Sequence, residues 1–502
     1  MSAHPEAASM HDVEEQLQPI PESSRTNRVS GQFWIWCGAN IAPINWVLGA
    51  LGVQMGLGLW DTVLVLVLGN LIGMAVFGFF VLLGQRSGAT GVVLSRGPFG
   101  RVGSYLPAFI HTIVPMIWCA LNTWIVLDLV MALLGKIGLV DASHANTGLR
   151  ILIAGLIMIA QVVISWYGYR AIAAFERWTV PVTIAILAAM SIAAWFFLHV
   201  DWSYAGAPGH VLTGAPKWAA MTGVMTAIGI GWGITWFIYA CDYSRFVSRE
   251  VPRRKLYIAS TLGQFVPVVW LGLLGATLAT KSTTVDPGQL IVQNFGAFAI
   301  PVLLLVLHGP IATNILNIYT AAVSTQALDL KIPRKVFSAV VGIVAFGVVV
   351  FFVYRSDFAG TLDGVLSGIV AWVATWAGIM LVHYHWVLRG RKWNSDSLFD
   401  PVGTPRLPAV NWAGMAAFVV GIVMTWLFMY GMVPALQGPI ASAMGGVDLS
   451  WLAGGLASAG VYAVLGPIVA RRYAGAADHA VPAQRSAAPV LADVADAPGV
   501  VA

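Results

Sequence analysis

The residues best suited to chemistry in this sequence are uncharged polar and aromatic side chains inside long apolar runs. One run carries, at spacings of four, three and four residues, His111, Pro115, Trp118 and Asn122. These spacings put the four side chains on one face of a helix. The Asn122 amide has donors and acceptors that can read the edge of a heterocycle, and the Trp118 indole one turn away offers a stacking face. The alternative is that Asn122 bridges helices and Trp118 fills space.

Two other runs carry side chains of the same kinds. Trp232 and Trp236 offer a second aromatic face, so a flat ligand would suit a gap between two indoles. Asn314 and Asn317 place two amides in one apolar run, where an amide is costly unless it has a partner or a task. Packing of the indoles and bonding of Asn317 to helix backbone are the alternatives. Together with Asn40, these residues are the predicted substrate contacts.

Few ionisable groups lie in the apolar runs. Asp128 is expected to reach water near the outer end of its run by snorkelling. Asp242 and Arg245 are spaced i,i+3 near the inner end of another run, and this spacing predicts an ion pair. We expect the pair to anchor the helix end, with gating as the alternative.

The composition defines the class of protein. Of 502 residues, 58% are hydrophobic and 10% are charged, whereas a soluble domain has about 25% charged residues. This balance indicates a membrane protein and excludes secreted disulfide scaffolds, disordered chains and cytosolic enzymes. The three cysteines lie inside apolar runs without a Cys-x-x-Cys spacing, which favours packing over a disulfide or a metal site.

Runs of about 20 apolar residues are long enough to span a bilayer. The sequence predicts twelve such spans, at 33–55, 60–84, 105–134, 148–167, 178–198, 218–241, 256–280, 298–327, 336–354, 363–388, 411–432 and 450–470. With the N-terminus inside, 22 of the 27 lysines and arginines fall in cytoplasmic segments, as the positive-inside rule requires. We therefore expect a multi-pass protein of the cell membrane (plasma or inner) with both termini cytoplasmic, and no nucleic-acid partner despite the net charge of +5.

Two predicted spans contain residues that disfavour a regular helix. The first has Gly38, Asn40, Pro43 and Asn45 near its middle, and proline removes a backbone donor. The sixth has Gly223, Gly229, Gly231 and Gly233. The alternative is that these small residues serve close helix packing. Because the two spans lie five apart, the pattern predicts two inverted five-helix repeats with a site at their broken helices.

This pattern divides the chain into five parts. They are a cytoplasmic N-terminal tail at 1–30, a first repeat at 31–200, a second repeat at 215–390, two additional helices at 411–472 and a disordered C-terminal tail at 473–502.

The sequence resembles the nucleobase:cation symporter-1 family, the purine–cytosine permeases, over residues 25–392. The resemblance rests on Phe33-Trp34 with Asn40 and Pro43, Gly84-Gln-Arg-Ser-Gly88, Ser95-Arg-Gly-Pro-Phe-Gly100, Asp242-Tyr-Ser-Arg-Phe246 and Asn314-x-x-Asn317-x-Tyr319. It implies an all-α membrane fold of the leucine-transporter type, with twelve transmembrane helices in a 5+5 inverted repeat plus two extra helices. It is closer to the cytosine and purine members.

The resemblance also implies roles for individual residues. Trp118 matches the stacking tryptophan of the bacterial hydantoin transporter. Asn122 matches a glutamine in that protein and an asparagine in fungal cytosine–purine members. Trp232 lies one residue from the aligned aromatic position, and Asn314 falls in the family's amide cluster.

A cation site is implied in the same way, from backbone carbonyls at Gly38 and Ile41 and from Gly309, Ala312 and Thr313. The sodium-coupled pattern has a further hydroxyl among the last three positions. A hard cation needs several oxygen ligands, so the missing hydroxyl favours a proton over sodium as the coupling ion.

The predicted function is secondary transport of cytosine or a purine base by cation symport. The chain has no Walker A motif, which excludes transport driven by a P-loop ATPase site within this sequence. Allantoin, hydantoin, uracil or a thiamine precursor are alternative substrates, and a passive channel or an integral-membrane enzyme are the alternatives outside the class. We expect no enzymatic activity, no cofactor besides H+ or Na+, no firm metal site, and a monomer in the lipid bilayer.

Overall fold

The structure is a computed structural model that describes residues 17–477, apart from 142–145, 168, 208, 283, 285, 331–333, 356, 390–394 and 403–406. Residues 1–16 and 478–502 of the two predicted tails therefore lie outside the described residues. Within the described ranges the regular structure is helical, with a single β-bridge between Asn27 and Val247.

The α-helices are, in chain order, α2 (Val29–Asn40), α3 (Ile44–Gln54), α4 (Leu59–Ser87), α5 (Gly91–Leu94), α6 (Arg96–Phe99), α7 (Tyr105–Lys136), α8 (Thr147–Tyr167), α9 (Tyr169–Phe196), α10 (Gly214–Val224), α11 (Gly231–Thr235), α12 (Phe237–Ser244), α13 (Arg253–Ala279), α14 (Pro287–Phe295), α15 (Ala299–Val306), α16 (His308–Gln326), α17 (Arg334–Arg355), α18 (Phe358–Val382), α19 (Trp412–Leu427), α20 (Pro439–Ala443) and α21 (Ser450–Ala477). Two π-helical segments, η2 (Met225–Ile230) and η4 (His383–Val387), continue α10 and α18. Short 3-10 turns lie at η1 (Glu22–Ser24), η3 (Gly296–Phe298), η5 (Ser395–Phe399) and η6 (Pro434–Leu436).

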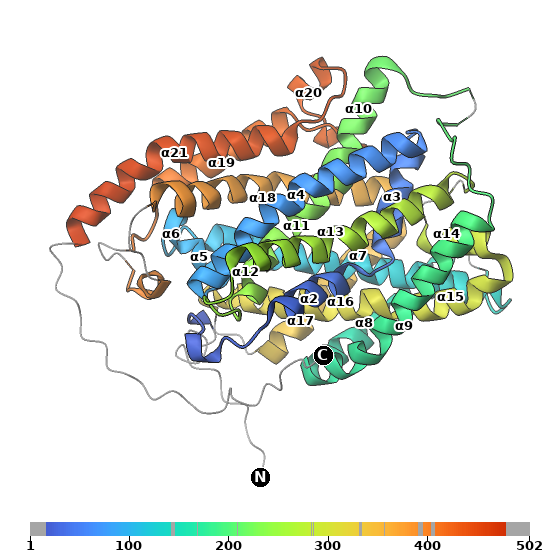
Figure 1. Cartoon of the computed structure of the whole chain (residues 1–502), viewed down its shortest axis with the longest axis horizontal. Coiled ribbons are helices and arrows are strands. Elements are labelled where there is room, and N and C mark those ends of the chain that lie inside the picture. The colour runs from blue at the N-terminus through green and yellow to red at the C-terminus, as the bar shows by residue number, and fades with distance from the viewer. Residues whose placement is uncertain are drawn as a thin grey trace, which may run out of the picture.

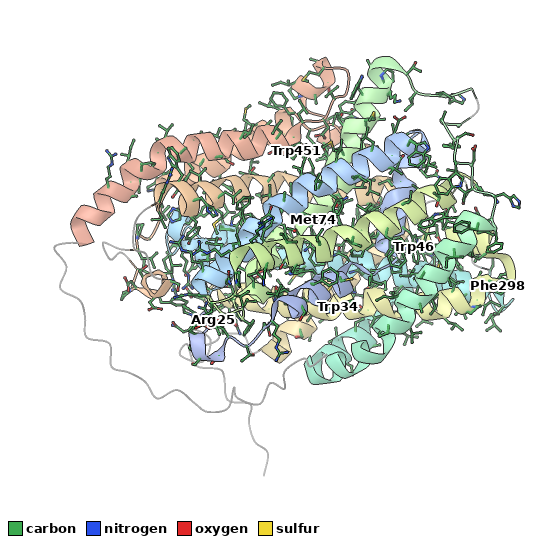
Figure 2. The ribbon with its side chains drawn as sticks, viewed as in Figure 1. Arg25, Trp34, Trp46, Met74, Phe298 and Trp451 are labelled. Carbon is green, nitrogen blue, oxygen red and sulfur yellow. The ribbon has the colours of Figure 1, made fainter. Side chains whose placement is uncertain are left out.

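The long helices lie roughly along one axis, with α19 and α21 at one edge and α8 and α9 at the opposite side (Figure 1). Arg25 and Phe298 lie toward opposite ends of this bundle, and Trp46 lies within it (Figure 2). In the most apolar 18-residue stretch of each span, 94% of the residues are buried for Gly214–Ser244 and 78% for Tyr105–Lys136, whereas 22% are buried for Ser450–Arg471. The helices that carry the predicted site are therefore central, and the C-terminal helix is peripheral.

Among the described residues, eight helices are long and apolar enough to span a membrane, or nine when the bent pair α2–α3 counts as one span. Three shorter apolar helices cover Thr147–Val163, Pro181–Phe196 and Trp412–Leu427. Multiple membrane passes are thus present, although these criteria alone do not define the twelve spans that the sequence predicts. The predicted span 298–327 divides into α15 and α16, and α14 precedes it as a helix that was not among the predicted spans.

The predicted break in the first span is confirmed. Helix α2 ends at Asn40 and α3 begins at Ile44, and their axes are bent by 54°. Pro43 has no backbone N–H to continue the α2 hydrogen bonds. The Asn40 side chain donates to the Trp36 carbonyl (2.9 Å), and the Asn45 side chain donates to the Asn40 carbonyl. The Asn45 amide thus satisfies a carbonyl that the break leaves open.

The sixth span is irregular, as predicted, and its glycines also serve close packing. The π-helical segment η2 interrupts it between α10 and α11. A Cβ on Gly229 would lie 2.8 Å from the Cα of Gly69 in α4, and one on Gly233 would lie 2.8 Å from the Cα of Gly73. Such backbone contact is possible only with glycine on both helices. Both interpretations of these glycines therefore hold, at different positions.

Asp128 does not reach water, contrary to the prediction. Its carboxylate forms an ion pair with Arg150 of α8, and both side chains are buried. The ion pair instead joins α7 to α8 inside the protein.

Replacing Asp128 by alanine should destabilise the protein by about 3–5 kcal/mol, because the charge of Arg150 would remain buried without this partner. The double variant Asp128→Leu, Arg150→Met should recover most of the loss, since it removes both charges. Thermal unfolding of the detergent-solubilised protein measures both effects. Equal melting temperatures for Asp128→Ala and wild type would contradict a structural role for the pair.

Candidate functional site

A cavity lies beside the break between α2 and α3. Four elements border it: the α2–α3 break, α7, the α11–α12 part of the sixth span, and α16. Its lining consists of Ala39, Ala42, Ile44, Trp118, Asn122, Trp232, Thr235, Trp236, Tyr239, Thr313 and Asn317. The structure thus brings together five of the predicted substrate contacts, Trp118, Asn122, Trp232, Trp236 and Asn317, around one space, while their assignment as substrate contacts stays a prediction.

Helix α7 supplies two lining side chains, as its periodicity predicts. Trp118 and Asn122 lie one turn apart and are buried. The Trp118 ring meets the Trp232 ring edge to face, with centroids 5.2 Å apart and an angle of 86° between the planes. The two indoles are therefore in contact in this conformation, without a gap between them. A flat ring can enter between them only if this contact opens.

Asn40 holds the Trp232 ring in this position. The Trp232 Nε1–H donates to the Asn40 side-chain oxygen over 3.0 Å. Asn40 is fully buried and is not among the lining residues. The structure therefore places this predicted substrate contact behind the cavity wall, where it links the helix break to the sixth span.

Trp236 is the second lining tryptophan of the sixth span. It contacts Trp232 edge to face at 5.9 Å between centroids, and it contacts Trp36 of α2 at 6.0 Å. On its other side it lies 5.4 Å from the Tyr239 ring. Three aromatic rings of the sixth span, Trp232, Trp236 and Tyr239, thus line the cavity in contact with one another, and Trp36 of α2 packs behind them.

The amides of α7 and α16 form a connected cluster. The Asn122 Nδ2 donates to Asn314 Oδ1 over 3.0 Å. The Asn317 Nδ2 approaches the same oxygen at 3.4 Å, and the Tyr239 hydroxyl donates to Asn317 Oδ1 at 3.0 Å. Asn314 is fully buried and lies behind the lining residues. It therefore supports the wall instead of facing the cavity.

Several polar residues of this region were not singled out from the sequence. Tyr239 and Thr235 line the cavity, and Thr123 and Gln161 bond to Asn314 behind it. Gln161 could have been noticed, because it is an amide inside an apolar run. The others are side chains common in membrane helices, and only their partners distinguish them.

The residues of the implied cation site lie next to the helix break. A Cβ on Gly309 would lie 3.4 Å from the Ile41 carbonyl oxygen, so glycine lets α16 approach the break. The Ile41 N–H donates to the carbonyls of Cys37 (3.0 Å) and Gly38 (3.3 Å). The Thr313 hydroxyl donates to the Gly309 carbonyl at 3.0 Å and lines the cavity. The side chain of Ala312 lies outside the described residues.

The expected ion pair between Asp242 and Arg245 is not formed. The Asp242 carboxylate accepts a hydrogen bond from the Gly91 N–H (3.4 Å) at the start of α5. The Arg245 guanidinium lies over the Phe246 ring, 4.9 Å from its centroid. Arg245 is the C-cap of α12, with helical backbone angles, and its N–H donates to the Cys241 carbonyl at 3.0 Å, so the directions of the two side chains and not the backbone keep the groups from pairing.

Comparison with known proteins gives the same architecture. The chain resembles a nucleobase-cation-symport-1 family transporter solved in an inward-facing conformation, with a TM-score of 0.71, 19% identity, and coverage of 93% of this chain and 98% of that one. The same transporter in a closed conformation with bromovinylhydantoin bound gives a TM-score of 0.70. These likenesses confirm the predicted all-α membrane fold of the leucine-transporter type.

Curated relatives are permeases. A putative purine-cytosine permease of Bacillus subtilis is 28% identical over 460 residues, which cover 89% of this chain and 94% of that protein. A purine-cytosine permease of Saccharomyces cerevisiae is 26% identical, covering 82% and 78%. The hydantoin permease of Microbacterium maritypicum is 25% identical, covering 75% and 78%.

The family described as permeases for cytosine/purines, uracil, thiamine and allantoin matches residues 19–454, which is most of the chain. The chain is therefore a multi-pass membrane transporter and not an enzyme, as predicted. It belongs to the nucleobase:cation symporter-1 family, nearest to its cytosine and purine members.

Proposed function

We propose that the protein imports a nucleobase, cytosine or a purine base, by symport with a cation. The names of its relatives support this substrate class, since the permeases of B. subtilis and S. cerevisiae are described as purine-cytosine permeases. It acts as a monomer in the cell membrane. Both termini lie in the cytoplasm, in agreement with the distribution of basic residues in the sequence.

The chemistry of the cavity wall is the observation that carries the proposal. None of the described residues lining the cavity bears a formal charge; they are aromatic, amide, hydroxyl and small apolar residues. In addition, the indole Nε1–H groups of Trp118 and Trp236 are buried and have no acceptor among the described residues. Buried donors usually have a partner, so carbonyl or ring-nitrogen acceptors of a flat neutral heterocycle suit this wall.

The coupling ion is a proton in preference to sodium. Thr313 is the one hydroxyl among the three α16 positions of the implied cation site, and it already donates to Gly309. A sodium ion would have to recruit its remaining oxygens from the carbonyls near Gly38 and Ile41. Removing one side-chain oxygen from such a site weakens it, because hard cations depend on oxygen ligand number.

Alternating access explains the position of the cavity. It lies at the bend between α2 and α3 and beside the irregular sixth span, the elements that inverted-repeat transporters place around their central site. In the present conformation Trp232 closes onto Trp118. Substrate entry then requires the helix packing around this contact to open toward one side of the membrane.

Uptake of labelled cytosine, hypoxanthine, uracil and allantoin into transport-deficient cells tests the proposal. We expect cytosine or hypoxanthine to accumulate against its gradient, to stop accumulating with a protonophore, and to be unaffected when sodium is replaced by choline. Accumulation of allantoin or uracil alone would assign the other heterocycles instead. Equilibration without accumulation would indicate a passive channel, and sodium-dependent uptake that resists the protonophore would refute proton coupling.

A further inference from the structure

A chain of hydrogen bonds leads from α8 to the cavity wall. Gln161 of α8 is fully buried and is not among the lining residues. Its Oε1 accepts from Asn314 Nδ2 at 3.0 Å and from the Thr123 hydroxyl at 2.9 Å. Asn314 in turn contacts Asn122, which lines the cavity. Gln161 is therefore connected to the lining residue Asn122 through a single intervening side chain, that of Asn314.

The partners of Asn314 determine which end of its amide faces Asn122. Its Nδ2 lies 3.0 Å from the main-chain carbonyl oxygen of Cys119, which can only accept. The Gln161 oxygen and the Thr123 hydroxyl lie on the same side. Turning the Asn314 amide end for end would place its oxygen against the Cys119 carbonyl oxygen, two acceptors with no donor between them. The Asn314 oxygen must therefore face the Asn122 side chain.

The orientation of Asn314 determines which atom of the Asn122 amide faces Asn314 and which atom is left for a ligand. Since Asn314 presents an oxygen, Asn122 must give its Nδ2 to that contact, which measures 3.0 Å. The Asn122 Oδ1 is then the remaining polar atom of the side chain, and it accepts no hydrogen bond from the described residues. The corresponding oxygen of Asn317 is already bonded to the Tyr239 hydroxyl at 3.0 Å. Asn122 thus offers the cavity a free carboxamide acceptor.

We propose that Gln161 is a positioning residue for substrate specificity, which acts through Asn314 to make Asn122 present an acceptor to the ligand. The heterocycle must then place an unsubstituted N–H, from the ring or an amino group, against Asn122 Oδ1. An analogue methylated at that nitrogen is rejected because it cannot donate. This inference rests on the proposed function and names the hydrogen-bonding pattern that the site selects.

The substitution Gln161→Met removes the acceptor while keeping the length of the side chain. Asn314 then keeps only the Cys119 carbonyl and the Thr123 hydroxyl as partners of its Nδ2, so its orientation, and through it that of Asn122, is held less strongly. Gln161→Glu is the matched conservative variant, since Gln161 Nε2 has no partner among the described residues and Glu keeps an acceptor oxygen. Gln264→Met is a structural control, because Gln264 is an equally buried amide of α13 outside the cluster.

The readout is competition against uptake of the labelled substrate by the parent heterocycle and by its singly N-methylated analogues. In wild type we expect one methyl analogue to compete less well than the parent heterocycle. The measured quantity is the ratio of the inhibition constant of that analogue to the inhibition constant of the parent. In Gln161→Met this ratio should fall by about tenfold, the size of one lost hydrogen-bond preference, while Gln161→Glu and Gln264→Met keep the wild-type ratio. A merely structural role for Gln161 would lower the maximal rate without changing the ratio.

The outcomes distinguish the two proposals. If wild type transports the heterocycle and Gln161→Met keeps the full discrimination between parent and methyl analogue, the positioning role is wrong and the transport function stands. If wild type competes equally well with every methyl analogue, the acceptor role of Asn122 is wrong. If wild type takes up none of the four heterocycles, the proposed function itself fails.

Discussion

Replacing Asn122 by alanine should reduce heterocycle uptake at least about 100-fold, because a buried site built to hydrogen-bond its ligand loses most of its selectivity when the bond cannot form. Asn122 lines the cavity, and its free oxygen is oriented by the bond to Asn314. Initial uptake rates in transport-deficient cells, normalised to protein at the membrane, measure the effect.

Two further variants show whether the loss is specific to the site. Asn122→Gln keeps an amide at the position and should retain part of the activity, with altered substrate preference because the longer side chain shifts the amide. Asn294→Ala is a control outside the cavity, since the Asn294 side chain bonds within its own helix to the Leu290 carbonyl. Unchanged uptake in Asn122→Ala, or an equal loss in Asn294→Ala, would rule out the proposed site.

Replacing Gly275 by alanine should prevent folding or destabilise the protein by more than about 4 kcal/mol, a loss reserved for severe backbone or core conflicts. Helices α3 and α13 pack with their backbones in contact. A Cβ on Gly275 would overlap the carbonyl oxygen of Trp46, and one on Gly49 would overlap the carbonyl oxygen of Gly272. Backbone atoms cannot move aside like a side chain, so α3 would have to leave α13.

Yield and thermal unfolding of the solubilised protein, followed by size-exclusion chromatography, measure this effect. Gly347→Ala is the matched control, because a Cβ at Gly347 in α17 would meet no heavy atom within 4 Å. It should melt at or slightly above the wild-type temperature, since alanine favours a helix over glycine. A wild-type melting temperature for Gly275→Ala would mean that α3 does not depend on this contact.

The class of protein and several of the residues that line the cavity follow from local features of the sequence. Scarce charge requires a bilayer around the chain, and Pro43 interrupts the first span because its ring removes a donor. Helical periodicity puts Trp118 and Asn122 on one face, and both do line the cavity. These properties depend on residues within one or two helical turns of each other.

The partners of the charged side chains could not be predicted from the sequence in the same way. Asp128 was expected to face water, yet it pairs with Arg150; Asp242 was expected to pair with Arg245, yet it bonds to Gly91. Periodicity gives the face of a helix that is polar, but it does not give the neighbour that this face meets or the angle between them. The partners lie on other helices or beyond a helix end.

The sequence by itself therefore determined that this chain is an all-α membrane transporter of its family, with uncharged amides and indoles on its central helices. Only the tertiary structure decided how those groups are arranged: Trp232 closes edge to face on Trp118, Asn40 and Asn314 stand behind the wall, and Gln161 bonds to Asn314, which bonds to Asn122. The reason is physical. Residue type and spacing specify which hydrogen-bonding groups must be buried, whereas the rotation and packing of helices distant in sequence specify which partners satisfy them.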